Sequence, residues 1–185
     1  MKDEEIRAVY TDDIIRVYQA YNKKIAREAI KNGSFGSSFK LDRMTWIKPS
    51  FLWMMYRCGW ATKENQECVL AIDMKREAFD YIVKHAVVSS YREELYGSYE
   101  EWKKQIQNSD IRVQWDPEKD LYGNSLEYRS IQLGLRGEAI KQYVEEWIVN
   151  ITDITDYVME LREMLSMKKD IQDLLPKEKV YLIKE

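Results

Sequence analysis

Histidine and cysteine are scarce in this sequence, which contains one His and two Cys among 185 residues. The cysteines, Cys58 and Cys68, stand among bulky apolar neighbours, and no spacing typical of metal ligands is present. These absences argue against a zinc site and a disulfide framework, so a reduced, cytoplasmic protein without a metal is expected. Long apolar runs are missing too. No segment approaches the roughly 20 apolar residues of a membrane span, and the first five residues are acidic, so no membrane association is expected.

Familiar catalytic motifs are absent as well. The sequence has no phosphate-binding loop, no Gly-rich dinucleotide fingerprint and no Ser-His-Asp order. The lone His85 lies within an expected core-facing helix, where a structural role is more common than catalysis. Hydrolase and Rossmann chemistries are therefore poorly supported.

The net charge of −3 conceals an uneven distribution of charge along the chain. Between Arg16 and Lys63 there are ten Lys and Arg residues against two acidic ones, whereas the remainder carries nineteen basic and thirty acidic residues. A segregated basic region attracts anionic ligands. Alternatively, the acidic remainder folds back and neutralises the basic region internally.

Hydrophobic periodicity predicts short strands interleaved with helices. Residues 68–74 are expected to form a strand, whose continuously apolar part at 69–72 is typical of a central strand, and Asp116-Pro117 is expected to stop the strand that starts at Ile111. The sequence thus predicts a mixed α+β class with short strands and flanking helices, in one domain over residues 1–185 with a core at about 5–160. The expected strands span 14–21, 44–47, 68–74, 111–115, 127–135 and 147–151, and the expected helices span 23–31, 50–56, 75–89, 91–108, 137–146 and 156–175.

The segment from Met44 to Arg57 contains the corner Lys48-Pro49-Ser50 between a strand and a helix. Pro49 ends the strand because it lacks an N–H, and the Ser50 hydroxyl suits the N-cap of the following helix. Free amides and the positive end of the helix dipole favour an anion at this corner. A buried, aromatic strand–helix joint explains the same residues, and the two interpretations are compatible.

Polar and aromatic residues gather on the expected strands and at this corner. Arg and Lys bind phosphates, and Tyr and Trp stack on rings, so the set suits a nucleotide-like ligand. The alternative is structural, with the aromatic side chains in the core and the arginines paired with Glu118, Asp120 and Glu127. The candidate binding residues are Arg16, Tyr18, Gln19, Trp46, Lys48, Ser50 and Arg57.

Four segments carry a resemblance to a known family: RVYQAYN at 16–22, RMTWIKPSFLWMMYR at 43–57, QWDPE at 114–118 and YRSIQ at 128–132. Together they resemble family 4291 of the domains of unknown function, over roughly residues 5–160. This resemblance supplies a family but implies no activity.

The order of elements is similar, more loosely, to the ADP-ribosyltransferase fold. That similarity implies an NAD site in which Gln19 or Arg16 on the first strand holds a ribose. It also implies a helix that ends at Gly33, followed by a strand and helix, Trp46 through Tyr56, that lie against the nicotinamide.

The same similarity places a catalytic glutamate on a late strand, where this sequence has Gln132. A carboxylate stabilises an oxocarbenium-like centre, whereas a neutral amide only forms hydrogen bonds. Glu127 is the nearest carboxylate, but its offset puts it on the other face of the strand. Gln132 and Glu127 are therefore the candidate catalytic residues.

Three hypotheses follow from these observations. The first is an NAD-dependent transferase of the ADP-ribosyltransferase type, in which Lys48 and Arg57 contact phosphate while Tyr18 and Trp46 stack on a ring. The second is a non-catalytic module that binds a nucleotide or RNA through the same surface, with a steep salt dependence. The third is a structural or interaction protein whose basic half is neutralised internally.

Overall fold

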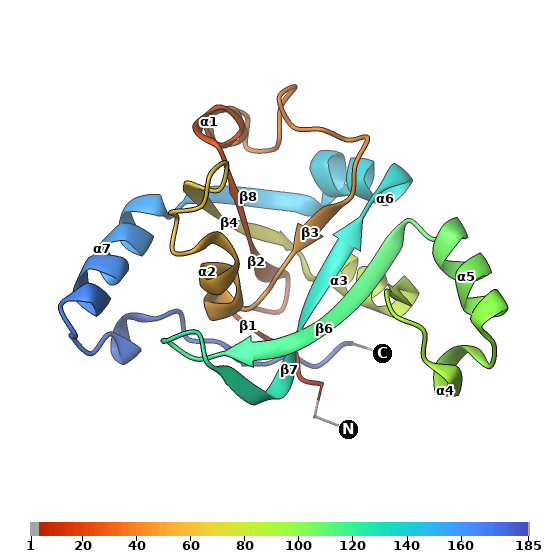
Figure 1. Cartoon of the computed structure of the whole chain (residues 1–185). Coiled ribbons are helices and arrows are strands. Elements are labelled where there is room, and N and C mark those ends of the chain that lie inside the picture. Colours follow the sequence, from red (N-terminus) through yellow and green to blue (C-terminus); the bar gives the residue numbers. More distant parts are fainter. Residues whose placement is uncertain (1–3, 185) are drawn as a thin grey trace.

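The computed structural model describes residues 4–184, and Figure 1 shows a mixed α+β fold built on two main sheets. The first sheet has the order β2-β4-β8, with β2 at Ile14–Tyr21, β4 at Cys68–Lys75 and β8 at Ile148–Asp153. Both pairings in this sheet are antiparallel. The central strand β4 is buried at every position except Lys75, as its continuous apolar sequence predicts.

The second sheet has the order β3-β7-β6-β5. Its strands are β3 at Thr45–Ile47, β7 at Ser125–Leu135, β6 at Ile111–Lys119 and β5 at Val87–Val88. Only the short β5 is parallel to its neighbour. A two-stranded pair joins the ends of the described chain, with β1 at Arg7–Ala8 beside β9 at Lys179–Val180.

Helices surround the two sheets. Helices α4 and α5 lie at one side of the molecule beside the second sheet, and α7 lies at the opposite side, while α3 packs against β2 and β4 of the first sheet and against β6 (Figure 1). Side chains of Asn22, Ser50 and Ser98 cap α1, α2 and α5, as their sequences predict. The helices are α1 Lys23–Asn32, α2 Phe51–Cys58, α3 Arg76–His85, α4 Glu93–Tyr96, α5 Tyr99–Asn108, α6 Gly137–Gln142, the π-helical turn η1 Tyr143–Trp147, α7 Thr155–Ser166 and the short 3₁₀ turn η2 Gln172–Leu174.

Within the described residues, a single backbone bridge links the two main sheets. The amide of Tyr18 in β2 donates a hydrogen bond to the carbonyl of Lys48, which follows β3, at 2.8 Å. Beyond this bridge the rest of β2 does not pair with β3, because β3 pairs with β7 instead. The two strands therefore diverge, and the space between them is open to polar side chains.

The hydrophobic core has two parts. One lies between the sheets and contains Ile15, Val17, Ile72 and Leu133, all fully buried. The other packs α2 and α7 against the opposite face of β2 and β4, around Tyr18 and Phe51. Because successive strand residues point to opposite faces, β2 supplies both parts.

Most expected elements are confirmed, with several corrections. Strand β6 does not stop at Asp116-Pro117 but continues to Lys119. Pro117 still lies opposite Arg129, and the register shifts directly after it; such an irregularity tolerates a residue that has no N–H to donate. The helix expected over 75–89 ends at His85, and the one expected over 156–175 ends at Ser166. Strands β1, β5 and β9 were not predicted. No helix within residues 4–184 is long and apolar enough to cross a membrane.

Candidate functional site

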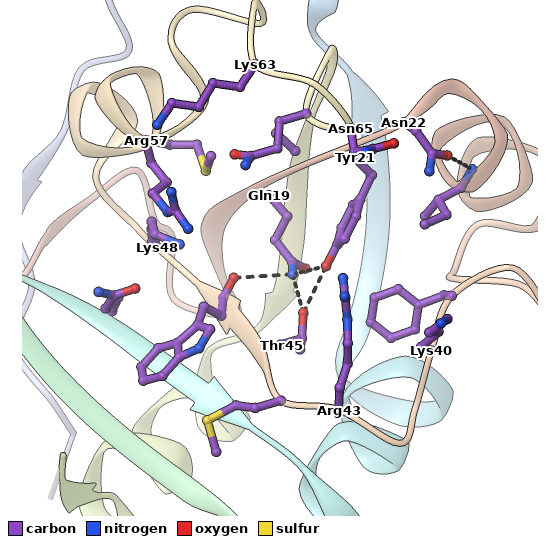
Figure 2. Close-up of a pocket in the computed structure, with 18 of the residues that line it drawn as sticks. Gln19, Tyr21, Asn22, Lys40, Arg43, Thr45, Lys48, Arg57, Lys63 and Asn65 are labelled. Atoms are coloured by element: carbon purple, nitrogen blue, oxygen red, sulfur yellow. Dashed lines mark hydrogen bonds between the residues drawn. The ribbon is translucent and has the colours of Figure 1, made fainter.

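A cleft of about 1190 Å³ opens where β2 and β3 diverge (Figure 2). Its walls come from the end of β2, the start of α1, the loop before β3, helix α2 and the 63–66 turn. Strands β6 and β7 contribute Gln114, Asp116 and Gln132 from the second sheet. The cleft therefore brings together segments that are up to about 110 residues apart in the sequence.

The cleft is strongly basic. Asp116 is the only carboxylate among its lining residues. None of its six cationic side chains forms an ion pair or a hydrogen bond within residues 4–184. Internal neutralisation by the acidic part of the chain therefore does not extend to these cations. They are Lys24, Lys40, Arg43, Lys48, Arg57 and Lys63, and all belong to the basic segment 16–63.

Four polar side chains form a floor cluster under the cleft: Gln19, Thr45 and Tyr143, which are buried, and Tyr21, which is half-buried. Gln19 is 3% exposed, and its amide nitrogen donates to the hydroxyls of Tyr21 at 2.8 Å and Thr45 at 2.9 Å. Its amide oxygen accepts a hydrogen bond from Tyr143 at 2.7 Å. The floor cluster thus ties the diverging strands together through side chains where backbone pairing has ended.

The floor cluster leaves one hydroxyl proton for a ligand. The oxygens of Tyr21 and Thr45 lie 2.9 Å apart, and only one of them donates to the other. The Gln19 amide nitrogen only donates to these hydroxyls, and the Gln19 oxygen already accepts from Tyr143, so the hydroxyl that accepts in the Tyr21–Thr45 pair keeps a proton with no acceptor within the cluster. Both residues line the cleft, as Figure 2 shows. A bound hydroxyl, carbonyl or phosphate oxygen suits this donor.

Lys48 is the most enclosed cation of the cleft, with 5% of the residue exposed. Its ammonium group lies 5.7 Å from the ring centroid of Trp53, a cation–π contact. The pKa of Lys48 is lowered to about 8, mainly by burial and also by the neighbouring charge of Arg57, against smaller opposite effects of Asp116 and Cys58. Figure 2 shows Lys48 and Arg57 on one side of Gln19, with Arg43 and Lys40 on the other.

Aromatic residues form part of the wall. Trp46, Trp53 and Tyr56 all line the cleft. The Trp46 ring lies over Gly134, its partner in β7, and a Cβ built on that glycine would come within 3.0 Å of the ring. The absence of a side chain at residue 134 therefore leaves room for the Trp46 ring and for the Met44 sulfur, which would lie 2.6 Å from such a Cβ.

The carboxylate of Asp116 is held between two amides. It accepts hydrogen bonds from Gln114 at 2.9 Å and from Gln132 at 2.6 Å, each on a different oxygen. Gln114 and Gln132 are paired residues of β6 and β7, and Asp116 follows Gln114 on the same strand face. Gln132 thus positions the one negative charge of the cleft.

Five of the nine residues predicted from the sequence line this cleft: Gln19, Trp46, Lys48, Arg57 and Gln132. Gln19 does so from the buried floor, where its amide is already bonded.

The other four lie elsewhere. Arg16 forms a two-point ion pair with Asp73 on the neighbouring strand, at 2.8 and 2.9 Å. Tyr18 is 1% exposed, packs against Phe51 and has no surface on which a ligand ring could stack. Glu127 is exposed on β7, away from the cleft. Ser50 is buried as the cap of α2.

The anion site expected at the Lys48-Pro49-Ser50 corner is filled from within the chain. The amide of Trp53 donates to the Ser50 hydroxyl at 3.1 Å, and the amide of Phe51 donates to the Glu178 carboxylate at 2.7 Å. A carboxyl oxygen near the end of the described chain thus occupies one of the free amides that an external anion would need at this helix end. Lys48 instead contributes to the cleft.

Sequence reasoning did not select several cleft residues. Arg43, Lys63 and Asp116 were not among the candidates, although Arg43 and Asp116 lie in the segments that carry the family resemblance. The period of two along β6 offered a signal, because it puts Asp116 on the same face as Gln114. For Lys63 the only signal was its place in the basic segment.

The sequence model of the domain of unknown function DUF4291 matches residues 5–181, nearly the whole chain. The chain belongs to the DUF4291 family. The match is longer than the 5–160 expected from the sequence, and in this DUF4291 chain it includes Glu178, which caps α2. No curated protein matches the sequence.

Proposed function

We propose that the basic cleft binds a nucleotide that carries a pyrophosphate, and that NAD is its ligand. The observation that carries this proposal is the set of six cations without internal partners against one carboxylate. Unpaired cations in a concave site attract phosphates more strongly than cations on an open surface. The volume of about 1190 Å³ is ample for a dinucleotide.

Each part of such a ligand has suitable neighbours in the cleft. The guanidinium groups of Arg43 and Arg57 suit the two phosphates, because Arg binds phosphate oxygens in pairs. The indole of Trp46 offers a face for a base or nicotinamide ring. The spare hydroxyl proton of Tyr21 or Thr45 suits a ribose oxygen.

We further propose ADP-ribosyl transfer as the reaction, with Asp116 in place of the missing glutamate. A carboxylate beside the reacting ribose stabilises the positive charge that develops when nicotinamide leaves. Asp116 is the only carboxylate that lines the cleft, and Gln132 and Gln114 fix its orientation. Glu127, which the sequence also offered, is remote from the cleft and is not part of this proposal. A cytoplasmic location, where NAD is available, is part of the same proposal.

Calorimetric titration with NAD tests the binding step. We expect saturable binding that weakens by about tenfold or more in Arg57→Gln, because one charged hydrogen bond to phosphate is worth about 1.5–3 kcal/mol. Lys141→Gln is the matched control, since Lys141 is exposed, pairs with Glu138 and lies outside the cleft. An absence of heat with the unaltered protein at millimolar NAD would refute the proposal.

Nicotinamide release tests the catalytic step. Asp116→Asn keeps the size of the side chain but removes the charge, so we expect release to fall by about a hundredfold while NAD still binds. Release that survives unchanged in Asp116→Asn would refute the role of this carboxylate.

A non-catalytic RNA-binding role is the second candidate. It is favoured by three exposed lysines at the cleft, Lys24, Lys40 and Lys63, over which a longer polyanion could continue. In that case affinity rises with the length of a single-stranded RNA, and its logarithm falls steeply with the logarithm of the salt concentration. Mononucleotides and NAD would then bind weakly.

A further inference from the structure

Lys48 has an environment that differs from that of a phosphate-binding lysine. Its side chain is enclosed among Trp53, Arg57 and Asp116, and its amino group has no hydrogen-bond or ion-pair partner within residues 4–184. A lysine that serves only as a fixed charge is normally paired or solvated, because burying an unpaired ammonium group is costly. Lys48 is neither.

The groups that face Lys48 favour its uncharged form on balance. Burial contributes most, and the positive charge of Arg57 on α2 acts in the same direction, against smaller opposite effects of Asp116 on β6 and Cys58 on α2. With a pKa of about 8, roughly a tenth of the Lys48 side chains are free amines at pH 7, about 300 times the share in an ordinary lysine. Only the free amine is a nucleophile.

We infer that Lys48 forms an imine with a phosphorylated aldehyde or ketone that enters the basic cleft. This inference goes beyond the proposed binding of NAD, because it assigns covalent chemistry to a residue of the same cleft. The geometry behind it is an unpartnered, enclosed amine that lines a cleft also supplied with two arginines and three further lysines for the phosphate.

The step is balanced without a further reagent. The lone pair of the Lys48 amine attacks the carbonyl carbon, a C–N bond forms, and one N–H proton passes to the oxygen to give a carbinolamine. The hydroxyl of that adduct takes a proton from solvent and leaves as water, and a protonated imine remains. Enclosure of Lys48 limits access of bulk water to this imine and so slows its hydrolysis.

Arg43 and Arg57 define the class of substrate. Both line the same cleft as Lys48, and both are free of carboxylate partners within the described residues; Figure 2 shows Arg57 on the Lys48 side of Gln19 and Arg43 on the other side. A small carbonyl compound without a phosphate lacks a partner for these charges. We therefore expect the phosphate to hold the carbonyl group near Lys48 and to increase the rate of imine formation.

Reductive trapping tests this inference on the full chain. The protein is incubated with pyridoxal 5′-phosphate as the probe, reduced with borohydride, which delivers a hydride to the imine carbon, and digested for peptide mass spectrometry. We expect Lys48 to be labelled about tenfold or more faster than the exposed Lys141 at pH 7. We also expect pyridoxal, which lacks the phosphate, to label Lys48 about tenfold more slowly.

Two variants of Lys48 and one of a neighbour sharpen the experiment. Lys48→Arg keeps the positive charge. Lys48→Met keeps an unbranched side chain of similar length and serves if the arginine does not fit. Both variants should lose the adduct at residue 48, while circular dichroism and the melting temperature show that the fold is intact. Arg57→Gln removes the nearby like charge. It should shift the pH at which Lys48 labelling is half-maximal upward from about pH 8, with pyridoxal as well as with its phosphate.

The inference is overturned if Lys48 is labelled no faster than Lys141, or if labelling of its peptide rises with pH as it does for surface lysines. The outcome is independent of the NAD titration, because the probe contains no dinucleotide. Protection of Lys48 from labelling by NAD would support both proposals. Fast labelling of Lys48 in a protein that does not bind NAD would support imine formation and refute the proposed nucleotide binding.

Discussion

Glu178 is the clearest place to test the energetics of this fold. Its carboxyl group accepts a hydrogen bond from the amide of Phe51 at 2.7 Å and so caps α2. This helix contributes Trp53, Tyr56 and Arg57 to the cleft. Burial raises the pKa of Glu178 to about 8, and the carboxyl of Glu118 adds to this effect, while the Phe51 amide acts against it. The glutamate therefore resists ionisation in the folded protein.

The sign of the pH dependence follows from the raised pKa. Between the ordinary value of 4.5 and about 8, the folded protein holds a proton that the unfolded chain has lost. The free energy of unfolding therefore falls as the pH rises through this interval, and the penalty is absent below it. At pH 7 the shift corresponds to about 3 kcal/mol, and because the residue is partly exposed we expect about 1–3 kcal/mol.

Glu178→Gln removes the penalty and keeps the cap, because the amide oxygen of glutamine also accepts the Phe51 N–H. We expect the variant to be more stable than the parent by about 1–3 kcal/mol at pH 7, with the difference shrinking towards pH 4.5. Urea unfolding at a series of pH values measures it. Glu127→Gln, at an exposed glutamate, is the control and should change stability by less than about 0.5 kcal/mol.

The reasoning fails if the stability difference between Glu178→Gln and the parent is the same at pH 5 and pH 8. A difference that does not vary with pH would mean that the two side chains differ in packing or hydrogen bonding and not in ionisation.

Three further predictions concern the sheets and the floor cluster. Gly134→Ala should destabilise the protein by about 1–3 kcal/mol and shift the tryptophan fluorescence, because the added Cβ meets the Trp46 ring at about 3.0 Å. Arg16→Gln should destabilise the protein by about 1–3 kcal/mol and lower its melting temperature, because the ion pair with the largely buried Asp73 is lost. NAD binding by this variant should be unchanged if Arg16 is outside the site. Tyr143→Phe should lower the free energy of unfolding in urea by about 1–2 kcal/mol, because the buried oxygen of Gln19 loses the hydrogen bond from the Tyr143 hydroxyl. An unchanged urea midpoint would contradict the importance of this hydrogen bond.

Much of the fold could be predicted because its elements have strong local signals. The alternation in β2, the apolar run in β4 and the caps Asn22 and Ser50 each depend on neighbouring residues alone. The two-residue strands β1, β5 and β9 are too short to show a period. The extension of β6 through Pro117 depends on its partner strand, which the local sequence does not reveal.

The candidate site was predicted in part for a related reason. The residues next to β3 reach the cleft because that strand lies at the junction of the sheets. Arg16 looked like a free cation until strand pairing placed Asp73 opposite it. Tyr18 and Gln19 are consecutive on one strand and so point to opposite faces, and only Gln19 faces the cleft. The period of two could have excluded one of them.

The Glu178 cap also bears on the order in which the chain can mature during synthesis. The helix that it closes starts at Phe51, 127 positions earlier, so a ribosome must add a further 127 residues before the partner of that amide exists. Until then the Phe51 amide in the first turn of α2 lacks its hydrogen-bond acceptor, and the side of the cleft that α2 forms lacks this contact. Contacts of such long sequence separation form late and slowly. This wall of the cleft is therefore completed only after residue 178 has been synthesised and has reached Phe51.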